Sequence, residues 1–524
     1  MKQLPFLLIG FLITTITFGQ SNTYTWGGPI DPLQARYEVE RYTLSLEFFP
    51  ETQEIHGSNL VKINCEGRLD TLRLNLINEY KVKKVEIYDE EVKFSHANDL
   101  LDIYIPDGCA TEAKIYYGGK TPIATNPPWS GGFTWEKDEN DNYWMGLSSQ
   151  NEGAKIFMPA KDHPSSEPSM GVDLYLTAPS PYFIASNGRL AKTEKTENKI
   201  TYHWTTNYPI NNYNINFTLG IFHKEEKEYF SIEGNAIPMM VYVLEENNDK
   251  APLLLSVLEN STKTHEYYFG EFPFPEDKIA VVETPYLGME HQTINGYGNN
   301  FQFVRMGDTW YDWLLHHELG HEWWGNKVSV NDWAHFWIHE GLTAYGDWLY
   351  FLKHDGEKAY REKARSEKRN IHHQQAIVAP DHATAEEAYH GEIYTKGAYI
   401  IHSLRFLLGD EVFFPMLKAM ANDERFIYQN RVTTADLIDF VKNYSNKDLK
   451  EFFNLYLYTI DIPEIKINKK SRGRYDIRMT HISLPVEIET SDGIKKHTLS
   501  DKPTTIKSET VPVIDPNDWY LLKK

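Results

Sequence analysis

The sequence predicts a multidomain α+β protein, with an N-terminal antiparallel β-domain, a mainly helical middle domain and a small C-terminal β-domain. Three observations lead to this fold class. At 524 residues the chain is too long for one hydrophobic core. Its hydrophobic residues (41%) and charged residues (24%) have the proportions of a globular protein. The spacing of its apolar residues changes from strand-like to helix-like and back again.

The two β-domains are expected at 21–222 and at 461–524. Apolar and polar residues alternate there, as they do in strands with one buried face. The alternating apolar residues are Tyr42, Leu44, Leu46, Phe48, Leu72, Leu74, Leu76, Tyr475, Ile477 and Met479. A turn signal at Asp492 and Gly493 favours a hairpin in the last domain.

The middle domain is expected at 223–460, where apolar residues recur three and four positions apart. Helices are predicted around 252–269, 310–325, 337–353, 394–408 and 433–458. Thr433 and Asp436 have the spacing of a capping box at the start of the last helix.

The charge balance restricts the partners. The chain has 74 acidic and 53 basic side chains and a formal net charge of -21. This field repels the phosphates of nucleic acids and anionic lipid surfaces, so we expect no nucleic-acid partner.

Residues 1–20 have the pattern of a signal peptide, with one lysine before an apolar run. The run of about fifteen residues is shorter than a membrane span, which needs about twenty, so a retained anchor is the lesser alternative. No cysteine lies near the expected cleavage region at Gly19 to Ser21, which leaves no site for a lipid anchor. We expect an exported, periplasmic or extracellular protein without stable membrane insertion.

Cys65 and Cys109 are the two cysteines of the chain. Export would permit a disulfide between them, and two buried thiols are the alternative. Two cysteines cannot form a structural zinc site alone, so any metal must be held by nitrogen and oxygen ligands.

A cluster of potential metal ligands begins at His317. His317 and His321 are four residues apart on a predicted helix, so they project within about 40° of each other and can reach one ion. Glu318 lies beside them, where a carboxylate can take a proton from water activated by a metal. This HExxH pattern is typical of zinc peptidases.

Glu340 supplies the third ligand. It lies on the next predicted helix, with eighteen residues between it and His321. Two neutral imidazoles and one carboxylate leave one zinc ion with an open position, which is the catalytic arrangement. The alternative to a metal site is a pair of histidines in an amphipathic core helix and a glutamate exposed to solvent.

Further charged residues lie nearby. Asp347, seven residues after Glu340, could accept a hydrogen bond from a ligand imidazole, and a surface salt bridge is the alternative. The remaining histidines of the region fit no ligand spacing and are expected to be ordinary core or surface residues: His316, His335, His339, His372 and His373.

The segments "HELGHEWWGNKV" and "WIHEGLTAY" together resemble the zinc signature of peptidase family M1, the aminopeptidase N family of gluzincins with leukotriene hydrolase-like members. "YLGMEH" resembles its exopeptidase motif, which places substrate binding on Gly288, Met289 and Glu290. "AYHGEIYTKGAY" resembles the segment of the catalytic tyrosine and assigns that role to Tyr394. The resemblance implies a thermolysin-like catalytic domain.

"SSQNEGAKIFMPAKDHPSSEPSM" resembles the end of the family's N-terminal domain, where Gln150 falls at the amine-binding position. Glu152 competes for this role, and Gln150 is preferred because it needs no gap. The chain departs from the family at Leu287 and His291 in the exopeptidase motif and at His339 before the glutamate ligand. It ends soon after the small β-domain, so the helical C-terminal domain typical of the family is expected to be missing and the cleft more open.

The resemblance implies a zinc aminopeptidase that acts on peptides with a free N-terminus. Glu318 is the expected general base, and the Tyr394 hydroxyl, with Tyr389 as a second candidate, would stabilise the oxyanion. A carboxylate at Glu290 would bind a free α-ammonium and penalise a blocked N-terminus. Two alternatives stay open: a same-fold hydrolase of a non-peptide substrate such as an epoxide, and a catalytically inactive peptide-binding homologue.

Overall fold

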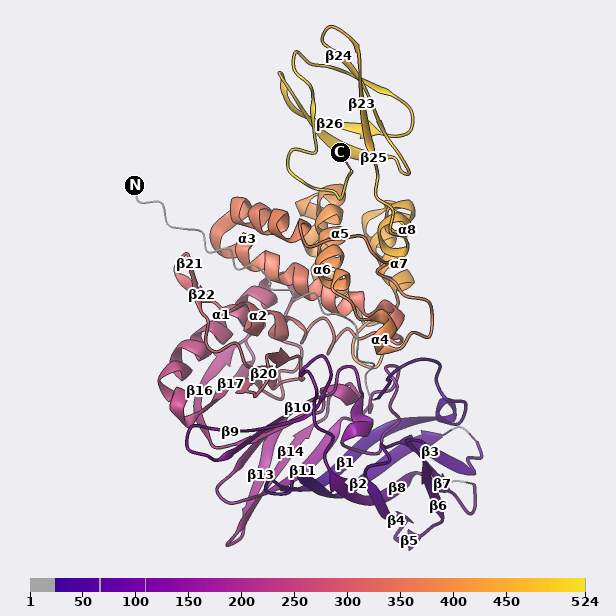
Figure 1. The fold of residues 1–524 in the computed structure, drawn as a ribbon, viewed down its shortest axis with the longest axis vertical. Coiled ribbons are helices and arrows are strands. Elements are labelled where there is room, and N and C mark those ends of the chain that lie inside the picture. The colour runs from indigo at the N-terminus through magenta and orange to yellow at the C-terminus, as the bar shows by residue number, and fades with distance from the viewer. Residues whose placement is uncertain (1–23, 66, 109, 524) are drawn as a thin grey trace.

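The structure is a computed structural model that describes residues 24–65, 67–108 and 110–523. The expected signal peptide at 1–20 lies outside the described residues. Cys109 does so too, so the pairing of Cys65 with Cys109 remains untested. Three parts of different architecture follow one another along the long axis of the molecule, β-rich, helical and again β-rich (Figure 1). This succession of domain types agrees with the fold class predicted from the sequence. The proposed domain boundaries stay predictions.

The N-terminal part is built on an eight-stranded sheet with the order β13-β14-β11-β1-β2-β8-β4-β5. Its strands are β1 (Tyr37–Phe49), β2 (Glu54–Cys65), β4 (Lys81–Ile87), β5 (Glu90–Glu91), β8 (Glu112–Lys120), β11 (Val172–Pro179), β13 (Arg189–Lys195) and β14 (Lys199–Thr206). The predicted alternation is confirmed, since Tyr42, Leu44, Leu46 and Phe48 of β1 are all buried. The sheet is not wholly antiparallel, because β1 and β11 pair in parallel.

Smaller elements complete this part. A three-stranded sheet contains β3 (Thr71–Asn75), β7 (Leu100–Tyr104) and β6 (Phe94–Ala97), and a four-stranded sheet contains β12 (Phe183–Ser186), β15 (Phe217–Gly220), β10 (Tyr143–Ser148) and β9 (Gly132–Lys137). Short 3-10 turns lie at η1 (Gln34–Arg36), η2 (Ala154–Ile156) and η3 (Asn212–Asn214). Leu72, Leu74 and Leu76 are fully buried, as their alternation predicts.

The middle part begins with a sheet that the sequence analysis did not predict. Its order is β16-β17-β18-β20-β19, and its strands are β16 (Phe222–Phe230), β17 (Ala236–Leu244), β18 (Ile279–Glu283), β20 (Asn295–Tyr297) and β19 (Gly288–Met289). Strand β18 is buried along its whole length. Such a short apolar run has no alternation to distinguish a strand from a buried helix. A two-stranded ribbon, β21 (Val304–Met306) and β22 (Thr309–Tyr311), follows.

The helices of the middle part follow the predicted helical pattern, except that the segment predicted as one helix at 433–458 forms two helices. They are α1 (Ala251–Phe269), α2 (Trp313–Gly320), α3 (Trp337–Lys368), α4 (Ala385–Ala388), α5 (Glu392–Leu408), α6 (Asp410–Met420), α7 (Thr434–Ser445) and α8 (Lys450–Tyr458), with 3-10 turns η4 (Glu245–Lys250) and η5 (Trp333–His335). The capping box of Thr433 and Asp436 is present. Helix α6 was not predicted. In the described part of the chain, no helix is long and apolar enough to cross a membrane.

The C-terminal part consists of two three-stranded sheets. One contains β23 (Ile465–Ser471), β24 (Arg474–Met479) and β27 (Thr504–Lys507), and the other β26 (Gly493–Leu499), β25 (Leu484–Thr490) and β28 (Val513–Ile514). Gly493 stands at φ 97° where β25 turns into β26, as the turn signal predicts. The part is fastened to α5, where Ser403 Oγ donates to the carbonyl of Trp519 at 2.6 Å.

Two glycines allow α3 and α5 to cross closely beside the candidate site. A methyl group added at Gly397 would lie 2.9 Å from the Cα of Gly341, and one added at Gly341 would lie 3.0 Å from the Cα of Gly397. Gly341 directly follows Glu340. The depth of this crossing therefore sets the position of the expected glutamate ligand.

We predict that Gly397→Ala lowers the free energy of unfolding by about 1 to 3 kcal/mol, because the new methyl group meets backbone that cannot rotate away. Urea denaturation of the full chain measures the loss. Gly391→Ala is the matched control, since Gly391 has helical φ and ψ at the start of α5 and nothing lies within 4 Å of its added methyl group. Equal stability of the two variants would contradict this account of the crossing.

Candidate active site

Helix α2 carries the two histidines of the HExxH motif, and its start is firmly fixed. Asp312 caps the helix by accepting from the N–H groups of Leu314 (3.0 Å) and Leu315 (3.1 Å). Tyr297 and Asn299 donate to the same carboxylate. The helix is shorter at both ends than the predicted segment 310–325, and His321 lies just after its last residue, Gly320.

His321 nevertheless keeps the helical geometry. It is the C-cap residue, with φ −65° and ψ −16°. The four-residue spacing therefore still brings the imidazoles of His317 and His321 together, and their Nε2 atoms lie 3.2 Å apart. The predicted pairing of these side chains is present in the structure.

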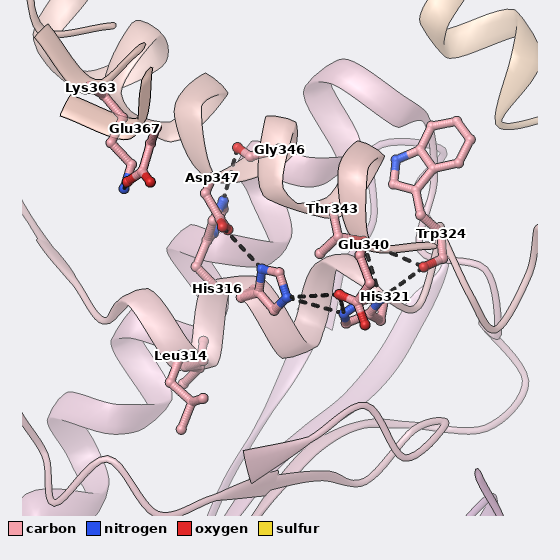
Figure 2. A network of polar contacts seen from close by, with 12 residues as sticks. Leu314, His316, His321, Trp324, Glu340, Thr343, Gly346, Asp347, Lys363 and Glu367 are labelled. Carbon is pink, nitrogen blue, oxygen red and sulfur yellow. Dashed lines mark hydrogen bonds and ion pairs between the residues drawn. The ribbon is translucent and has the colours of Figure 1, made fainter. Parts of the chain in front are cut away.

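Glu340, on the first turn of α3, faces the same point. Its Oε2 atom lies 3.5 Å from Nε2 of His317 and 3.3 Å from Nε2 of His321. Figure 2 shows Glu340 and His321 side by side, with Asp347 farther along α3. Among the described residues, these three side chains form the group of histidine and carboxylate ligands close enough to share one ion.

The outer nitrogens of the two imidazoles fix where their protons are. Nδ1 of His317 lies 3.0 Å from Oδ2 of Asp347, and Nδ1 of His321 lies 2.9 Å from the carbonyl oxygen of Trp324. Both partners accept hydrogen bonds, so each Nδ1 carries the proton and each Nε2 presents a lone pair. Asp347 thus occupies the position expected of a residue that orients a ligand imidazole.

When both imidazoles are neutral, as ligand imidazoles must be, the inner atoms are three acceptors without a donor between them. Among the described residues, only the Nε2 atoms of His317 and His321 are paired with the buried Oε2 of Glu340. Two neutral imidazole nitrogens and a carboxylate oxygen repel one another unless a cation lies among them. Nitrogen and oxygen ligands in this number match a catalytic zinc site, so the residues fit the metal that the motif implies.

The ionisable groups of this cluster act strongly on one another. Burial disfavours the charged form of His321, but the carboxylate of Glu340 outweighs burial and raises the pKa of His321 to about 9. Burial also opposes charge on Glu340, yet the two imidazoles hold the pKa of its carboxyl well below the usual range. The cluster therefore favours positive charge at its centre, which either a proton on an imidazole or a bound cation can supply.

Glu318 follows His317 on α2 and is 8% exposed. Burial raises the pKa of Glu318 to about 8. The two imidazoles oppose this rise, and the carboxylates of Glu290 and Glu340 add to it. Glu318 is thus an acid–base group with a pKa close to neutral pH, which suits proton transfer.

The exopeptidase motif lies against this cluster. Glu290 is 3% exposed, and its Oε1 accepts from Nε2 of Gln150 at 2.7 Å and from the hydroxyl of Tyr213 at 2.9 Å. Nε2 of Gln150 also lies 3.5 Å from Oε1 of Glu340. Gln150 therefore connects the carboxylate of the motif directly to Glu340, the third candidate metal ligand.

The competing residue, Glu152, points elsewhere, because its Oε1 accepts from the backbone N–H of Gly131 at 2.7 Å. Gly288 and Met289 form β19, which pairs with β20. A methyl group added at Gly288 would lie 2.9 Å from Cδ1 of Leu314, so the glycine lets this strand lie on α2. Both residues belong to the short strand that leads directly into Glu290.

Tyr394 lies on the first turn of α5, beside the ligands. Its ring stacks near that of His317, with centroids 5.9 Å apart. Its hydroxyl lies 2.7 Å from that of Tyr389, at the end of α4. Burial raises the pKa of Tyr394 well above the usual value, so the hydroxyl keeps its proton and can donate it to an acceptor.

The histidines that were expected to be ordinary core or surface residues lie outside the ligand set. Nε2 of His339 accepts from the N–H of Val330 at 3.1 Å, and His335 contacts the hydroxyl of Thr434 at 3.1 Å. His291, which replaces the usual asparagine of the motif, donates from Nε2 to the carbonyl of Leu147 at 3.0 Å. Two of the three departures from the family pattern are therefore hydrogen-bonded into the core.

Tyr213 is a residue of the candidate site that no sequence pattern predicted. Its hydroxyl holds Glu290, yet it lies 77 residues away along the chain. The only signal is a tyrosine within a run of asparagines at 211–216, which indicates a hydrogen-bonded turn and does not indicate its partner.

Comparisons with known proteins agree with this geometry. Residues 256–456 match the peptidase family M1 domain. Aminopeptidase N of Escherichia coli (strain K12) is 25% identical over 291 residues, which are 53% of this chain and 33% of that protein. Leucyl aminopeptidase of Saccharolobus solfataricus is 21% identical over 86% of this chain and 57% of its own length. The chain thus spans less than two thirds of these relatives.

Solved structures share the fold. An M1 zinc metallopeptidase mutant of Deinococcus radiodurans, bound to a Tyr-Ser-Ala substrate, superposes with a TM-score of 0.70 at 19% identity, over 82% of this chain and 95% of that one. Legionella pneumophila aminopeptidase A, in complex with aspartic acid, reaches 0.74 at 17% identity, over 93% of this chain and 60% of that one. Residues 256–456 thus carry a peptidase family M1 domain, and the three-part fold is the one seen in solved M1 zinc metallopeptidases.

Proposed function

We propose that this protein is a zinc aminopeptidase, with one zinc ion per chain, that releases N-terminal residues from peptides with a free α-amine. The observation that carries the proposal is the contact of Gln150 with both Glu290 and Glu340. It puts a buried anionic subsite beside the metal ligands. A peptide whose ammonium occupies that subsite has its first peptide bond near the ligands, so one residue is released at a time.

Glu290 and Gln150 would bind the substrate's N-terminus. The carboxylate of Glu290 is buried and offers its charge to an ammonium group, while the Gln150 side-chain oxygen supplies a further acceptor. An acetylated N-terminus has no positive charge and would leave the carboxylate buried and unpaired, which is costly. Selection for a free N-terminus follows from this penalty.

His317, His321 and Glu340 would hold the zinc ion, with Asp347 orienting His317. A zinc ion bound there supplies Lewis acidity toward water and the scissile carbonyl. Glu318 accepts a proton from the attacking water and passes it to the leaving amine. The Tyr394 hydroxyl donates to the oxyanion that develops on the carbonyl oxygen, and Tyr389 fixes the direction of that hydroxyl.

We also propose that the chain is exported to the periplasm or the extracellular space. The support is the pattern of residues 1–20 and the absence of a cysteine near Gly19 to Ser21.

A panel of fluorogenic amino-acid amides, free and N-acetylated, tests the proposed activity. We expect wild type to cleave the free amides alone and to lose activity on chelation, with recovery on adding zinc. In Glu290→Gln, which keeps the shape but removes the charge, the preference for free amides should fall roughly 30-fold, which corresponds to about 2 kcal/mol. Cleavage of acetylated and free amides at equal rates would refute aminopeptidase specificity. Binding without turnover would favour the inactive homologue, and turnover of epoxides alone would favour the non-peptide hydrolase.

The second test concerns Tyr394. Tyr394→Phe should reduce kcat by roughly a hundredfold or more while the zinc content stays at the wild-type value, because one oxyanion donor contributes about 2.7 to 4 kcal/mol. Glu318→Gln is the companion variant and should lose activity to a similar or greater extent, also with zinc retained. Turnover unchanged in Tyr394→Phe would remove this hydroxyl from the mechanism.

N-terminal sequencing of the protein from separated cell fractions and culture fluid tests export. The mature chain is expected outside the cytoplasm and should begin near Ser21, since the apolar run is removed by a signal peptidase. Recovery of the intact chain, still beginning at Met1, from the cytoplasm would contradict the proposal.

A further inference from the structure

Residues 24–28, called here the N-terminal segment, lie between two parts of the molecule. The backbone of Trp26 accepts from the N–H of Ala385 at 2.8 Å, and the N–H of Gly28 donates to Ala383 at 3.0 Å. From the other side, Nε2 of His163 donates to the carbonyl of Gly28 at 2.9 Å. The segment is therefore bonded both to the β-rich N-terminal part and to the helical part.

Trp26 is the buried anchor of the N-terminal segment. It is 1% exposed, and its Nε1 donates to the carbonyl of Asp162 at 3.1 Å. Its ring lies 5.2 Å from the ring of Tyr213 and 4.8 Å from that of Trp333, measured between centroids. Tyr213 and Trp333 also contact each other, at 5.8 Å. The three rings form one aromatic cluster.

The next residue shows how little space is left. Gly27 stands at φ +85°, and an added methyl group would lie 2.5 Å from Cδ1 of Trp333 and 2.9 Å from the carbonyl oxygen of Ala383. Any other residue would be strained there in both backbone and packing. The N-terminal segment is thus fitted closely to this position.

The aromatic cluster lies directly behind Glu290 and Gln150, the two residues of the proposed amine subsite. The ring of Tyr213 belongs to this cluster, and its hydroxyl donates to Oε1 of Glu290 at 2.9 Å. Trp333 packs on Phe336, with centroids 4.3 Å apart, and Phe336 precedes Glu340 by one helical turn. Removal of the Trp26 ring would take one aromatic contact from Tyr213 and one from Trp333.

Trp26 also supports the loop that carries Gln150. A methyl group added at Gly153 would lie 2.7 Å from Cδ1 of Trp26. The carboxylate of Asp162, whose carbonyl Trp26 holds, accepts from the N–H groups of Ala154 (2.9 Å) and Lys155 (3.1 Å). The Trp26 indole therefore contacts Tyr213, which binds Glu290, and also the loop that carries Gln150.

We propose that Trp26 is a positioning residue for the amine subsite, because it fixes Tyr213, and through Tyr213 the carboxylate of Glu290, from outside the family domain. The inference rests on the proposed function. It follows that a chain cleaved in the expected region at Gly19 to Ser21 keeps the subsite complete, whereas loss of residues 24–28 would disable recognition of the substrate's amine.

The kinetic test compares Trp26→Ala with Trp204→Ala in the full-length chain. Trp204 is a matched control, because it too is 1% exposed and donates from Nε1 to a carbonyl, that of Ile184 at 3.0 Å. We expect Trp26→Ala to raise KM for free amino-acid amides about tenfold and to lower the preference over acetylated amides, with zinc retained. Trp26→Phe, which keeps a ring, should recover most of the loss. Trp204→Ala should lower the melting temperature without changing the preference.

A second test does not depend on activity. Tyr213→Phe removes the hydroxyl that binds Glu290 and should lower the melting temperature of wild type and of Trp204→Ala by the same amount. In the Trp26→Ala background, Tyr213→Phe should lower the melting temperature by less than half as much. The reason is that the hydrogen bond between Tyr213 and Glu290 is already lost or weakened there. Equal losses in all three backgrounds would overturn the proposal. An unchanged preference for free amides in Trp26→Ala would also overturn it.

The two tests separate the proposals. If wild type shows no turnover, or cleaves free and acetylated amides alike, the proposed function fails and the melting-temperature comparison still decides the role of Trp26. If wild type is a specific aminopeptidase and Tyr213→Phe costs the same in every background, the proposed function stands and the positioning role falls.

Discussion

The site depends on one electrostatic constraint. Asp347 and the carbonyl of Trp324 hold the protons of the two imidazoles on their outer nitrogens, so the inner nitrogens and Glu340 face one another as acceptors. Such an arrangement is stable when a cation occupies its centre. The partners outside the ligand set are therefore as necessary as the ligands, because they decide which atoms are available.

The rest of the middle domain keeps these atoms in register. Asp312 fixes the start of the helix that carries the histidines, and the close crossing at Gly341 and Gly397 fixes the helix that carries Glu340. The two helices belong to different stretches of the chain, so neither can place the site alone. Rigid packing is what turns three separate side chains into one set of ligands.

The proposed amine subsite is assembled from even more distant segments. Glu290 directly follows the short strand β19, Gln150 comes from the N-terminal part and Tyr213 from a 3-10 turn of that part. Burying a carboxylate in this way is costly unless its oxygens are hydrogen-bonded. Gln150 and Tyr213 donate to Glu290 and offset part of this cost. The carboxylate keeps its negative charge, which would attract an ammonium group. The same hydrogen bonds thus serve both the stability of the subsite and its proposed selectivity.

The sequence alone determined the fold class, the helices around the motif and the pair His317 and His321, because strand alternation and the four-residue helical repeat are local properties. It also indicated Glu340, Glu290 and Tyr394 through their motifs. Only the tertiary structure placed Gln150, and not Glu152, against Glu290, placed Asp347 on His317 and revealed Tyr213 and Trp26 behind Glu290. These contacts join residues far apart in the chain, and local periodicity carries no information about which distant segments meet.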